Sequence, residues 1–242
     1  MKVLLCCEKK KRSKDPFQIY YVDPNCDFDC EFGRISKDQF ENCVVKTNMG
    51  IEMSCFESTF VDDFMRLKRG AQVILPKDIG AIITNAGINR DSVVVEGGSG
   101  SGWLACYLAS ICKKVISYDI KEDHQKTAIN NAKRLGLKNL SFKLKSLGEI
   151  SEKADVVIID IPQPWDVMEN ISAKLKPGAV VVTYCPTIPQ VMKSVEFSSN
   201  VNLFHFNTME MIQRTWRVDG RAVRPIPDNI GHTAFLSFFR RI

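Results

Sequence analysis

Short apolar runs that alternate with longer helical stretches constrain the fold of this chain more than any other feature. The apolar runs occupy residues 92–95, 114–118, 154–159 and 179–182, and stretches of helical length or periodicity occupy 104–111, 122–135, 167–175 and 191–196. Runs this continuous are typical of strands that are buried on both faces. Their alternation with helices predicts a parallel sheet covered by helices.

The two ends of the chain depart from this alternation. Residues 201–218 and 232–240 resemble two long strands around a loop with Asp219-Gly220 and two prolines, which predicts a terminal hairpin at the sheet edge. Near the start, Gln18–Val22 and other short runs are separated by turn formers, as in a small antiparallel β domain. We expect a β-rich N-terminal domain at 1–65 and an α/β domain at 66–242.

Composition excludes several classes of protein. Hydrophobic residues make up 45% and charged residues 25% of the chain, which argues against disorder. The formal net charge of +5 is compatible with a polyanionic partner but is too small for a histone-like binder. The basic run Lys9–Arg12 is interpreted as a solvated segment.

The spacing of the cysteines and the lengths of the apolar runs indicate the cellular compartment of the protein. The nine cysteines contain no CxxC pair, so reduced thiols are favoured, with a zinc site at Cys26 and Cys30 as the lesser alternative. The apolar start of the chain is too short for a signal peptide, and no apolar segment approaches the length of a membrane span. We expect a cytoplasmic protein with no bound metal and no membrane partner.

A glycine-rich loop after the first apolar run indicates a ligand. The run continues into Glu96-Gly97-Gly98-Ser99-Gly100-Ser101-Gly102, and a helix begins near Trp103. Glycines let the backbone approach a ligand closely, and the helix start presents unpaired N–H groups. Asp119, at the end of the next strand, is placed to accept both hydroxyls of a ribose. Together these features predict a nucleoside cofactor.

The spacing of the loop distinguishes between cofactors. A nicotinamide cofactor favours GxGxxG, whereas the glycines here alternate after the acidic Glu96. A carboxylate suits the zwitterionic methionine part of S-adenosylmethionine and would repel a pyrophosphate. The pattern resembles the first motif of S-adenosylmethionine-dependent methyltransferases, which implies their seven-stranded, Rossmann-like α/β fold ending in an antiparallel hairpin. A nicotinamide-dependent oxidoreductase is the disfavoured alternative.

The run at 154–159 ends in Asp160-Ile161-Pro162-Gln163-Pro164-Trp165. The prolines prevent the strand from continuing, and open α/β sheets bind ligands at the carboxyl ends of their strands. Asp160 is therefore predicted to lie in the ligand crevice. The alternative is that Asp160 caps the helix that starts near Trp165.

Longer motifs resemble the tRNA adenine-58 N1-methyltransferase family of the TrmI type over about residues 66–242. Besides the glycine loop, the motifs are Arg69–Asp78, Ser117–His124, Asp160–Trp165, Leu175–Gly178, Pro186–Val191, Arg214–Trp216 and Gly231–Leu236. Leu75 stands where bacterial members have tyrosine, which favours an archaeal-type member.

The resemblance implies roles for particular residues. Ser101 to Leu104 would line the methionine part of the cofactor, Asp119 and His124 the ribose, and Ser146 and Leu147 the adenine. Several family members carry an acidic residue where this chain has Ser146. The predicted cofactor site comprises Glu96, Gly98, Gly100, Ser101, Gly102, Trp103, Leu104, Asp119, His124, Ser146, Leu147 and Asp160.

The implied reaction is methyl transfer from S-adenosylmethionine to N1 of adenine 58 in the tRNA T-loop, with adenine 57 left open. Asp160 falls on the family's active-site aspartate, where a carboxylate would stabilise the positive charge that develops on the ring. The target base must swing out of folded RNA. Residues 207–242 contain six arginines and three acidic residues, and among them Arg221 and Arg224 are predicted to bind phosphate. His232 is predicted either to bind substrate or to hydrogen-bond within the hairpin.

The resemblance also implies a homotetramer. Two other functions stay open at this stage. A small-molecule methyltransferase would share the cofactor half of the site, and a non-catalytic tRNA-binding subunit would share the fold. The glycine loop, Asp119 and Asp160 argue against the second, and the N-terminal domain and arginine-bearing hairpin favour RNA over a small molecule.

Overall fold

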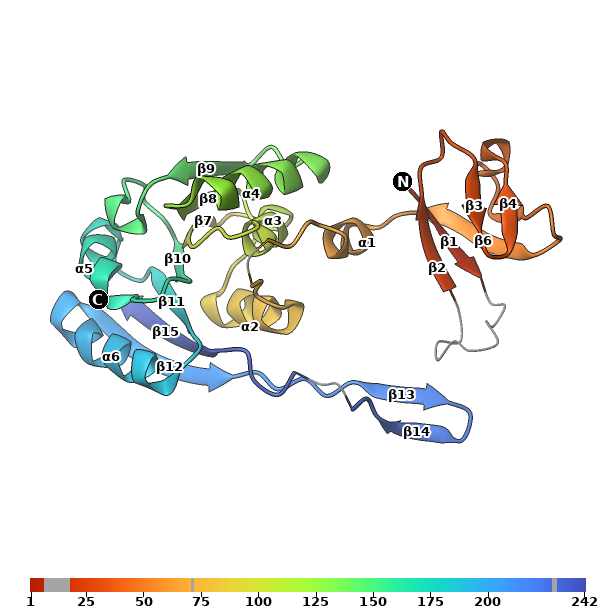
Figure 1. The fold of residues 1–242 in the computed structure, drawn as a ribbon. Helices are drawn as coiled ribbons and strands as arrows, with labels where there is room; N and C mark the ends of the chain where they lie inside the picture. The colour runs from red at the N-terminus through yellow and green to blue at the C-terminus, as the bar shows by residue number, and fades with distance from the viewer. Residues whose placement is uncertain (7–17, 71, 228–229) are drawn as a thin grey trace. The chain divides into compact units, whose positions relative to one another are not determined.

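The computed structural model describes residues 1–6, 18–70, 72–227 and 230–242 (Figure 1). The basic run Lys9–Arg12 lies outside the described residues. The chain divides into two compact units, one formed by Met1–Arg66 with Val218–Val223 and the other by Leu67–Arg217 with Arg224–Ile242. Among the described residues, no helix is long and apolar enough to cross a membrane.

The larger unit is built on a seven-stranded sheet with the order β12-β15-β11-β10-β7-β8-β9 (Figure 1). The strands are β7 (Val93–Gly97), β8 (Lys114–Asp119), β9 (Leu140–Leu144), β10 (Val156–Ile159), β11 (Val180–Cys185), β12 (Leu203–Glu210) and β15 (Phe235–Arg241). Strands β7 to β11 are parallel, whereas β15 pairs antiparallel with both β11 and β12. The predicted seven-stranded, Rossmann-like fold is confirmed.

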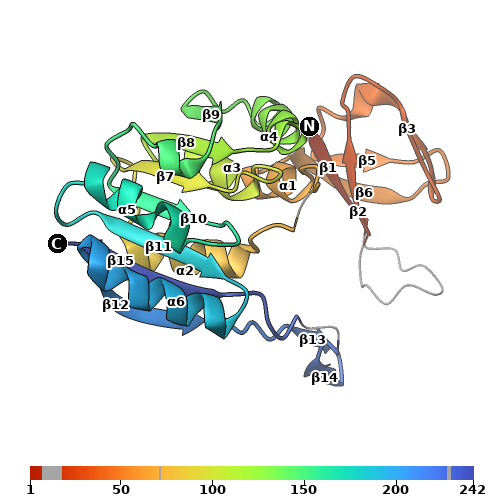
Figure 2. The same cartoon turned by 60° about the vertical axis from the view of Figure 1, so that its left-hand side comes forward.

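Helices cover both faces of this sheet, with α5 and α6 on one face and α2 on the other (Figure 2). On the α5 face, Tyr118, Ile159 and Val181 pack with Met168 and Ile171 in one apolar core. Side chains alternate between the faces along a strand, so the residues next to Tyr118 in β8 point to the opposite face. The helices are α2 (Pro76–Ala86), α3 (Trp103–Ala109), α4 (Glu122–Arg134), α5 (Trp165–Lys174) and α6 (Ile188–Ser198), with short 3-10 turns at Leu147–Glu149 and Ser199–Val201.

The terminal segment corrects the prediction of two long strands. Strand β12 ends at Glu210 and β15 begins at Phe235, and between them β13 (Trp216–Asp219) and β14 (Ala222–Pro225) pair as a separate two-stranded sheet. The Met211 backbone oxygen, which follows β12, accepts a hydrogen bond from Lys77 Nζ at 2.8 Å. The backbone oxygen that directly follows β12 is thus hydrogen-bonded to the Lys77 side chain.

The smaller unit contains the small β domain that the sequence predicts. Its four-stranded sheet has the order β2-β1-β6-β5, and each neighbouring pair is antiparallel. Leu4, Ile35, Phe40 and Met53 are buried in its apolar core. The elements are β1 (Lys2–Cys6), β2 (Gln18–Val22), β3 (Phe28–Cys30), β4 (Gly33–Ile35), a 3-10 turn (Lys37–Gln39), β5 (Val44–Lys46), β6 (Glu52–Glu57) and α1 (Phe60–Met65).

The cysteines of the described residues are free thiols, Cys26 and Cys30 among them. Within the same residues, no group of three or more His, Cys, Asp or Glu side chains is placed to hold a metal ion. The zinc alternative at Cys26 and Cys30 therefore gains no support from side-chain geometry.

Candidate cofactor and active site

The glycine loop joins β7 to α3 at the carboxyl edge of the parallel strands. Gly98, Gly100 and Gly102 have φ values of 95°, 51° and 77°, a region that favours glycine. A Cβ on Gly98 would lie 2.0 Å from the backbone oxygen of Asp160, and a Cβ on Gly102 would lie 2.8 Å from the Cβ of Ala128 in α4. The loop can therefore pass this close to the end of β10 and to α4 only with glycine at these positions.

Asp119 at the end of β8 is fixed by backbone donors. Its Oδ2 accepts a hydrogen bond from the Gly100 N–H at 3.0 Å, and its Oδ1 accepts one from the Lys121 N–H at 2.8 Å. His124 Nδ1 lies 3.2 Å from Asp119 Oδ2. One carboxylate thus ties the glycine loop to the start of α4 and remains at the mouth of the cavity described below.

Glu96 in β7 is a buried carboxyl next to this loop. Ser117 Oγ, in the neighbouring strand β8, donates a hydrogen bond to Glu96 Oε1 at 2.6 Å. Burial raises the pKa of Glu96 to about 8, the hydrogen bond from Ser117 opposes this rise, and the nearby carboxyls of Asp160 and Asp119 add to it. A cationic ligand group would therefore stabilise Glu96 in its charged form.

Asp160 follows β10 and is held by its backbone to β7, since its N–H donates to the Gly97 oxygen at 2.8 Å. Burial, with a smaller contribution from the charge of Asp119, raises the pKa of Asp160 to about 7. Helix α5 has Pro164 at its N-cap, with no side-chain cap hydrogen bond in the described structure. The alternative that Asp160 caps this helix is therefore wrong, and Asp160 lines both cavities described below.

Two adjoining cavities, of about 540 Å³ and about 20 Å³, lie along this edge of the sheet. They share Gln72, Gly98, Gly100 and Asp160. The predicted cofactor residues that line one or both cavities are Glu96, Gly98, Gly100, Ser101, Trp103, Leu104, Asp119, His124, Ser146, Leu147 and Asp160. Gly102 packs against α4 instead.

The environment of Ser101 indicates a ligand-binding position at the smaller cavity. Its Oγ is buried and has no hydrogen-bond partner within the described part of the chain. The Ser101 backbone oxygen is held by Asn131 of α4, whose Nδ2 lies 2.8 Å from it and 2.9 Å from the Lys68 oxygen. Since buried hydroxyls normally find a partner, a polar ligand atom fits this position.

Several lining residues escaped prediction from the sequence. Gln72, Ile120, Lys145 and Gln163 all line the larger cavity. Ile120 is 73% exposed although it is apolar, and it directly follows the strand-end carboxylate of Asp119. An exposed apolar residue here suits the face of an aromatic ring. That position after a strand-end acid is the signal that could have identified Ile120.

The predicted substrate-binding residues are not among the described residues that line these two cavities. Arg221 occupies the turn between β13 and β14, and Arg224 lies in β14; both are exposed. His232 Nδ1 lies 2.6 Å from Glu210 Oε1, and its Nε2 lies 2.7 Å from the Pro186 oxygen. These contacts agree with the prediction that His232 hydrogen-bonds within the hairpin. The hydrogen-bonded pair with Glu210 raises the pKa of His232.

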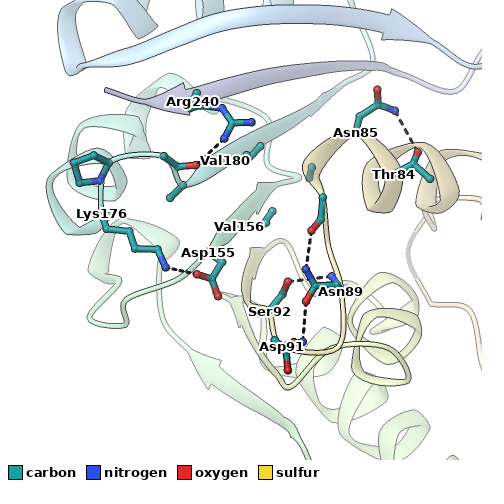
Figure 3. A pocket seen from close by; sticks show the side chains of 15 residues that line it. Thr84, Asn85, Asn89, Asp91, Ser92, Asp155, Val156, Lys176, Val180 and Arg240 are labelled. Atoms are coloured by element: carbon teal, nitrogen blue, oxygen red, sulfur yellow. Dashed lines mark hydrogen bonds and ion pairs between the residues drawn. The ribbon is translucent and has the colours of Figure 1, made fainter.

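A further cavity of about 590 Å³ lies at the amino ends of β10 and β11 (Figure 3). Its polar side chains bind neighbouring protein groups: Lys176 Nζ lies 2.6 Å from Asp155 Oδ1, and the Asn89 side chain donates to the Gly87 backbone oxygen at 3.3 Å. Arg240 donates to a backbone oxygen. Ligands of open α/β sheets bind at the opposite, carboxyl edge. The cavities beside the glycine loop, at that edge, are therefore the better candidate for a cofactor site.

Comparison with known proteins identifies the family. The sequence model of the family described as the tRNA methyltransferase complex GCD14 subunit matches residues 64–224. This chain belongs to the GCD14 family. The resemblance drawn from the sequence motifs is thereby confirmed, and with it a methyltransferase.

Named relatives of this GCD14-family chain span most of its length. The tRNA (adenine(57)-N(1)/adenine(58)-N(1))-methyltransferase TrmI of Methanocaldococcus jannaschii is 34% identical over 236 residues, covering 84% of each chain. The tRNA (adenine(58)-N(1))-methyltransferase TrmI of Thermus thermophilus is 33% identical over 205 residues, covering 82% of this chain and 80% of the relative. The solved structure of TrmI from Aquifex aeolicus has a TM-score of 0.80 at 25% identity, covering 100% of this chain and 97% of that one.

Proposed function

We propose that this chain transfers a methyl group from S-adenosylmethionine to N1 of adenine 58 in the T-loop of tRNA. The observation that supports the proposal is that Asp160, whose backbone lies against the glycine loop, lines both cavities. One group can thus face the cofactor on one side and a substrate base on the other. The Methanocaldococcus jannaschii relative includes adenine 57 in its name, so adenine 57 is the second position to examine.

The residues around the cavities fit the parts of S-adenosylmethionine. Asp119 offers carboxylate oxygens for the ribose hydroxyls, and Ile120 and Leu147 offer apolar surface for the adenine. Glu96 and the unpartnered Ser101 hydroxyl fit the charged and polar methionine end. When bound, the cofactor supplies a methyl group that is already activated by its sulfonium charge.

Asp160 is the residue that we propose for the chemical step. Methylation at N1 makes the adenine ring cationic, so a carboxylate beside N1 and the exocyclic amine stabilises charge that appears only in the transition state. The rest of the rate comes from holding the base in line with the methyl group. The residues that line the larger cavity would perform this positioning.

The tRNA contacts, assembly, cellular location and metal independence of this protein stay predictions. Measurements on the purified protein and in cells test them. Arg221 and Arg224 are proposed to contact tRNA phosphates. Assembly as a homotetramer, residence in the cytoplasm and independence from metal ions also stay predictions. Light scattering tests the assembly, and activity in the presence of a chelator tests the metal.

Incubation of an unmodified tRNA transcript with the protein and S-adenosylmethionine tests the function. Mass spectrometry of the nucleosides should detect 1-methyladenosine, and fragment mapping should place it at position 58. A matched transcript with guanine at position 58 removes that product and isolates any methylation at 57. If 1-methyladenosine is absent from the first transcript, the proposed function is wrong.

A further inference from the structure

Three buried polar side chains form a chain of hydrogen bonds beside the glycine loop. Glu96, Ser99 and Ser117 are 2%, 6% and 0% exposed. Ser117 Oγ donates to Glu96 Oε1 at 2.6 Å, and the Ser99 and Ser117 hydroxyls are hydrogen-bonded to each other. When Glu96 is ionised, Ser117 donates its one hydroxyl hydrogen to Glu96, so Ser99 donates to Ser117. Hydrogen bonds are therefore donated from Ser99 in the loop to Ser117, and from Ser117 to the Glu96 carboxylate.

The backbone holds these three side chains next to one another. Glu96 and Ser117 are partners in the parallel register of β7 and β8, so their side chains stand next to each other on one face of the sheet. The N–H groups of Gly98 and Ser99 both donate to the Tyr118 oxygen of β8, at 2.8 Å and 3.2 Å. Ser99 is thus held against β8 by its backbone, where its hydroxyl meets that of Ser117.

The charges around Glu96 oppose its ionisation. The titratable groups that face it are Asp160 after β10, Asp119 at the end of β8 and the Cys106 thiol of α3. Burial and the two carboxyls raise the pKa of Glu96, whereas the hydrogen bond from Ser117 is the contact that lowers it. Ser117 is therefore the protein group that favours the charged form of this carboxyl.

We propose that Ser117, held by Ser99, is a positioning residue for the amino-acid end of the cofactor: it orients the Glu96 carboxylate so that this group pairs with the ligand's ammonium. The inference rests on the proposed function, in that the ligand is S-adenosylmethionine. Its consequence is selectivity, because Glu96 and Ser99 line the small cavity, whose volume suits a group of the size of an ammonium. A nucleoside without an ammonium group gains nothing from them.

The pH dependence of binding follows from the same contact. Below about pH 8 the carboxyl of Glu96 is mainly protonated, so binding of an ammonium group requires it to release a proton. Affinity for such a ligand should rise with pH toward that value, until the ligand's own amine begins to lose its proton. Loss of the Ser117 donor should move this rise to higher pH.

Calorimetric titration with two probes separates these effects. S-adenosylhomocysteine carries the ammonium group, and 5′-methylthioadenosine lacks the amino-acid part. Between about pH 6 and pH 9, Ser117→Ala should weaken S-adenosylhomocysteine about tenfold, leave 5′-methylthioadenosine unchanged and shift the pH midpoint up by about one unit. Ser99→Ala should act in the same direction but less strongly. Ser237→Ala removes a buried serine in β15, separated from β8 by three strands, and should change neither the ratio nor the midpoint.

One outcome would contradict the proposed cofactor, and another would contradict only the positioning role of Ser117. If the unaltered protein binds neither probe, the proposed cofactor is wrong and the role of Ser117 fails with it. If it binds both, and Ser117→Ala weakens both equally without a shift of the midpoint, Ser117 only supports the fold. In that case the positioning role is wrong and the proposed function stands.

Discussion

A Cβ on Gly98 would lie 2.0 Å from the backbone oxygen of Asp160, so the glycine loop and the end of β10 are in direct contact. Gly98→Ala should therefore displace Asp160 as well as strain the loop, whose φ at Gly98 is 95°. We expect a loss of about 3 kcal/mol or more in unfolding free energy and loss of cofactor binding. Thermal unfolding and calorimetric titration measure the two effects.

Gly178→Ala is the matched control for this substitution. Gly178 also has a positive φ, 89°, but nothing lies within 4 Å of its would-be Cβ. It should cost only the backbone strain, about 1 kcal/mol, and leave cofactor binding intact. Equal losses in the two variants would mean that contact with Asp160 is unimportant.

Asp160→Asn keeps the size of the side chain and removes its charge. Turnover on tRNA should fall about a hundredfold or more, because the charge acts in the transition state. The dissociation constant of S-adenosylmethionine should change only a few-fold, since Asp119 and the loop remain. A variant with full turnover would exclude Asp160 from the chemical step.

The rate of methyl transfer should depend on pH through Asp160, whose pKa burial raises to about 7. The charged form stabilises the cationic ring, so single-turnover rates at saturating cofactor should rise as pH increases through that value and then level off. Asp160→Asn should lack this rise. If the rise persists in the variant, another group titrates.

Lys77 joins helix α2 to both sides of the terminal segment. Its Nζ lies 2.7 Å from Asp78 Oδ1, 2.8 Å from the Met211 oxygen and 2.6 Å from Thr233 Oγ1. Lys77→Met leaves the fully buried Asp78 carboxyl without its cation, and we expect a loss of about 3 kcal/mol. Denaturant unfolding measures this loss, and Lys126→Met, which removes an exposed pair with Glu122, should cost less than about 0.5 kcal/mol.

The arginines of the β13–β14 hairpin should contribute to the salt dependence of tRNA binding. Replacement of Arg221 and Arg224 by alanine should reduce the slope of log affinity against log salt by about one for each phosphate that these side chains neutralise. Filter binding of tRNA at several salt concentrations measures the slope. Titration of S-adenosylmethionine should be unchanged, and an unaltered slope would exclude both arginines from phosphate binding.

Strand periodicity predicted the centre of the larger sheet because β7, β8, β10 and β11 are apolar on both faces. It missed β9, where Ser141 and Lys143 alternate with apolar residues at the sheet edge. It also missed α2, an 11-residue helix that begins at Pro76 and contains Gly80. Strands buried on both faces give a strong signal, whereas a five-residue edge strand and a helix that contains proline and glycine give a weaker one.

The candidate site shows the same division. Asp119 and Asp160 were placed at strand ends because a parallel sheet gathers those ends at one edge. The contact of Ser117 with Glu96 depends on the register between β7 and β8, and that of Lys77 with Thr233 joins residues 156 positions apart. Neither is encoded in a local pattern, so only the assembled sheet reveals them.

The position of β15 affects how the chain is completed during synthesis. This strand lies between β11 and β12, and within the described sheet it is the partner of β12. On the ribosome, β11 therefore presents an open edge and β12 has no ladder to join until residues 235–241 emerge. The sheet closes when β15 inserts between β11 and β12, a step that joins distant parts of the sequence and therefore favours slow folding.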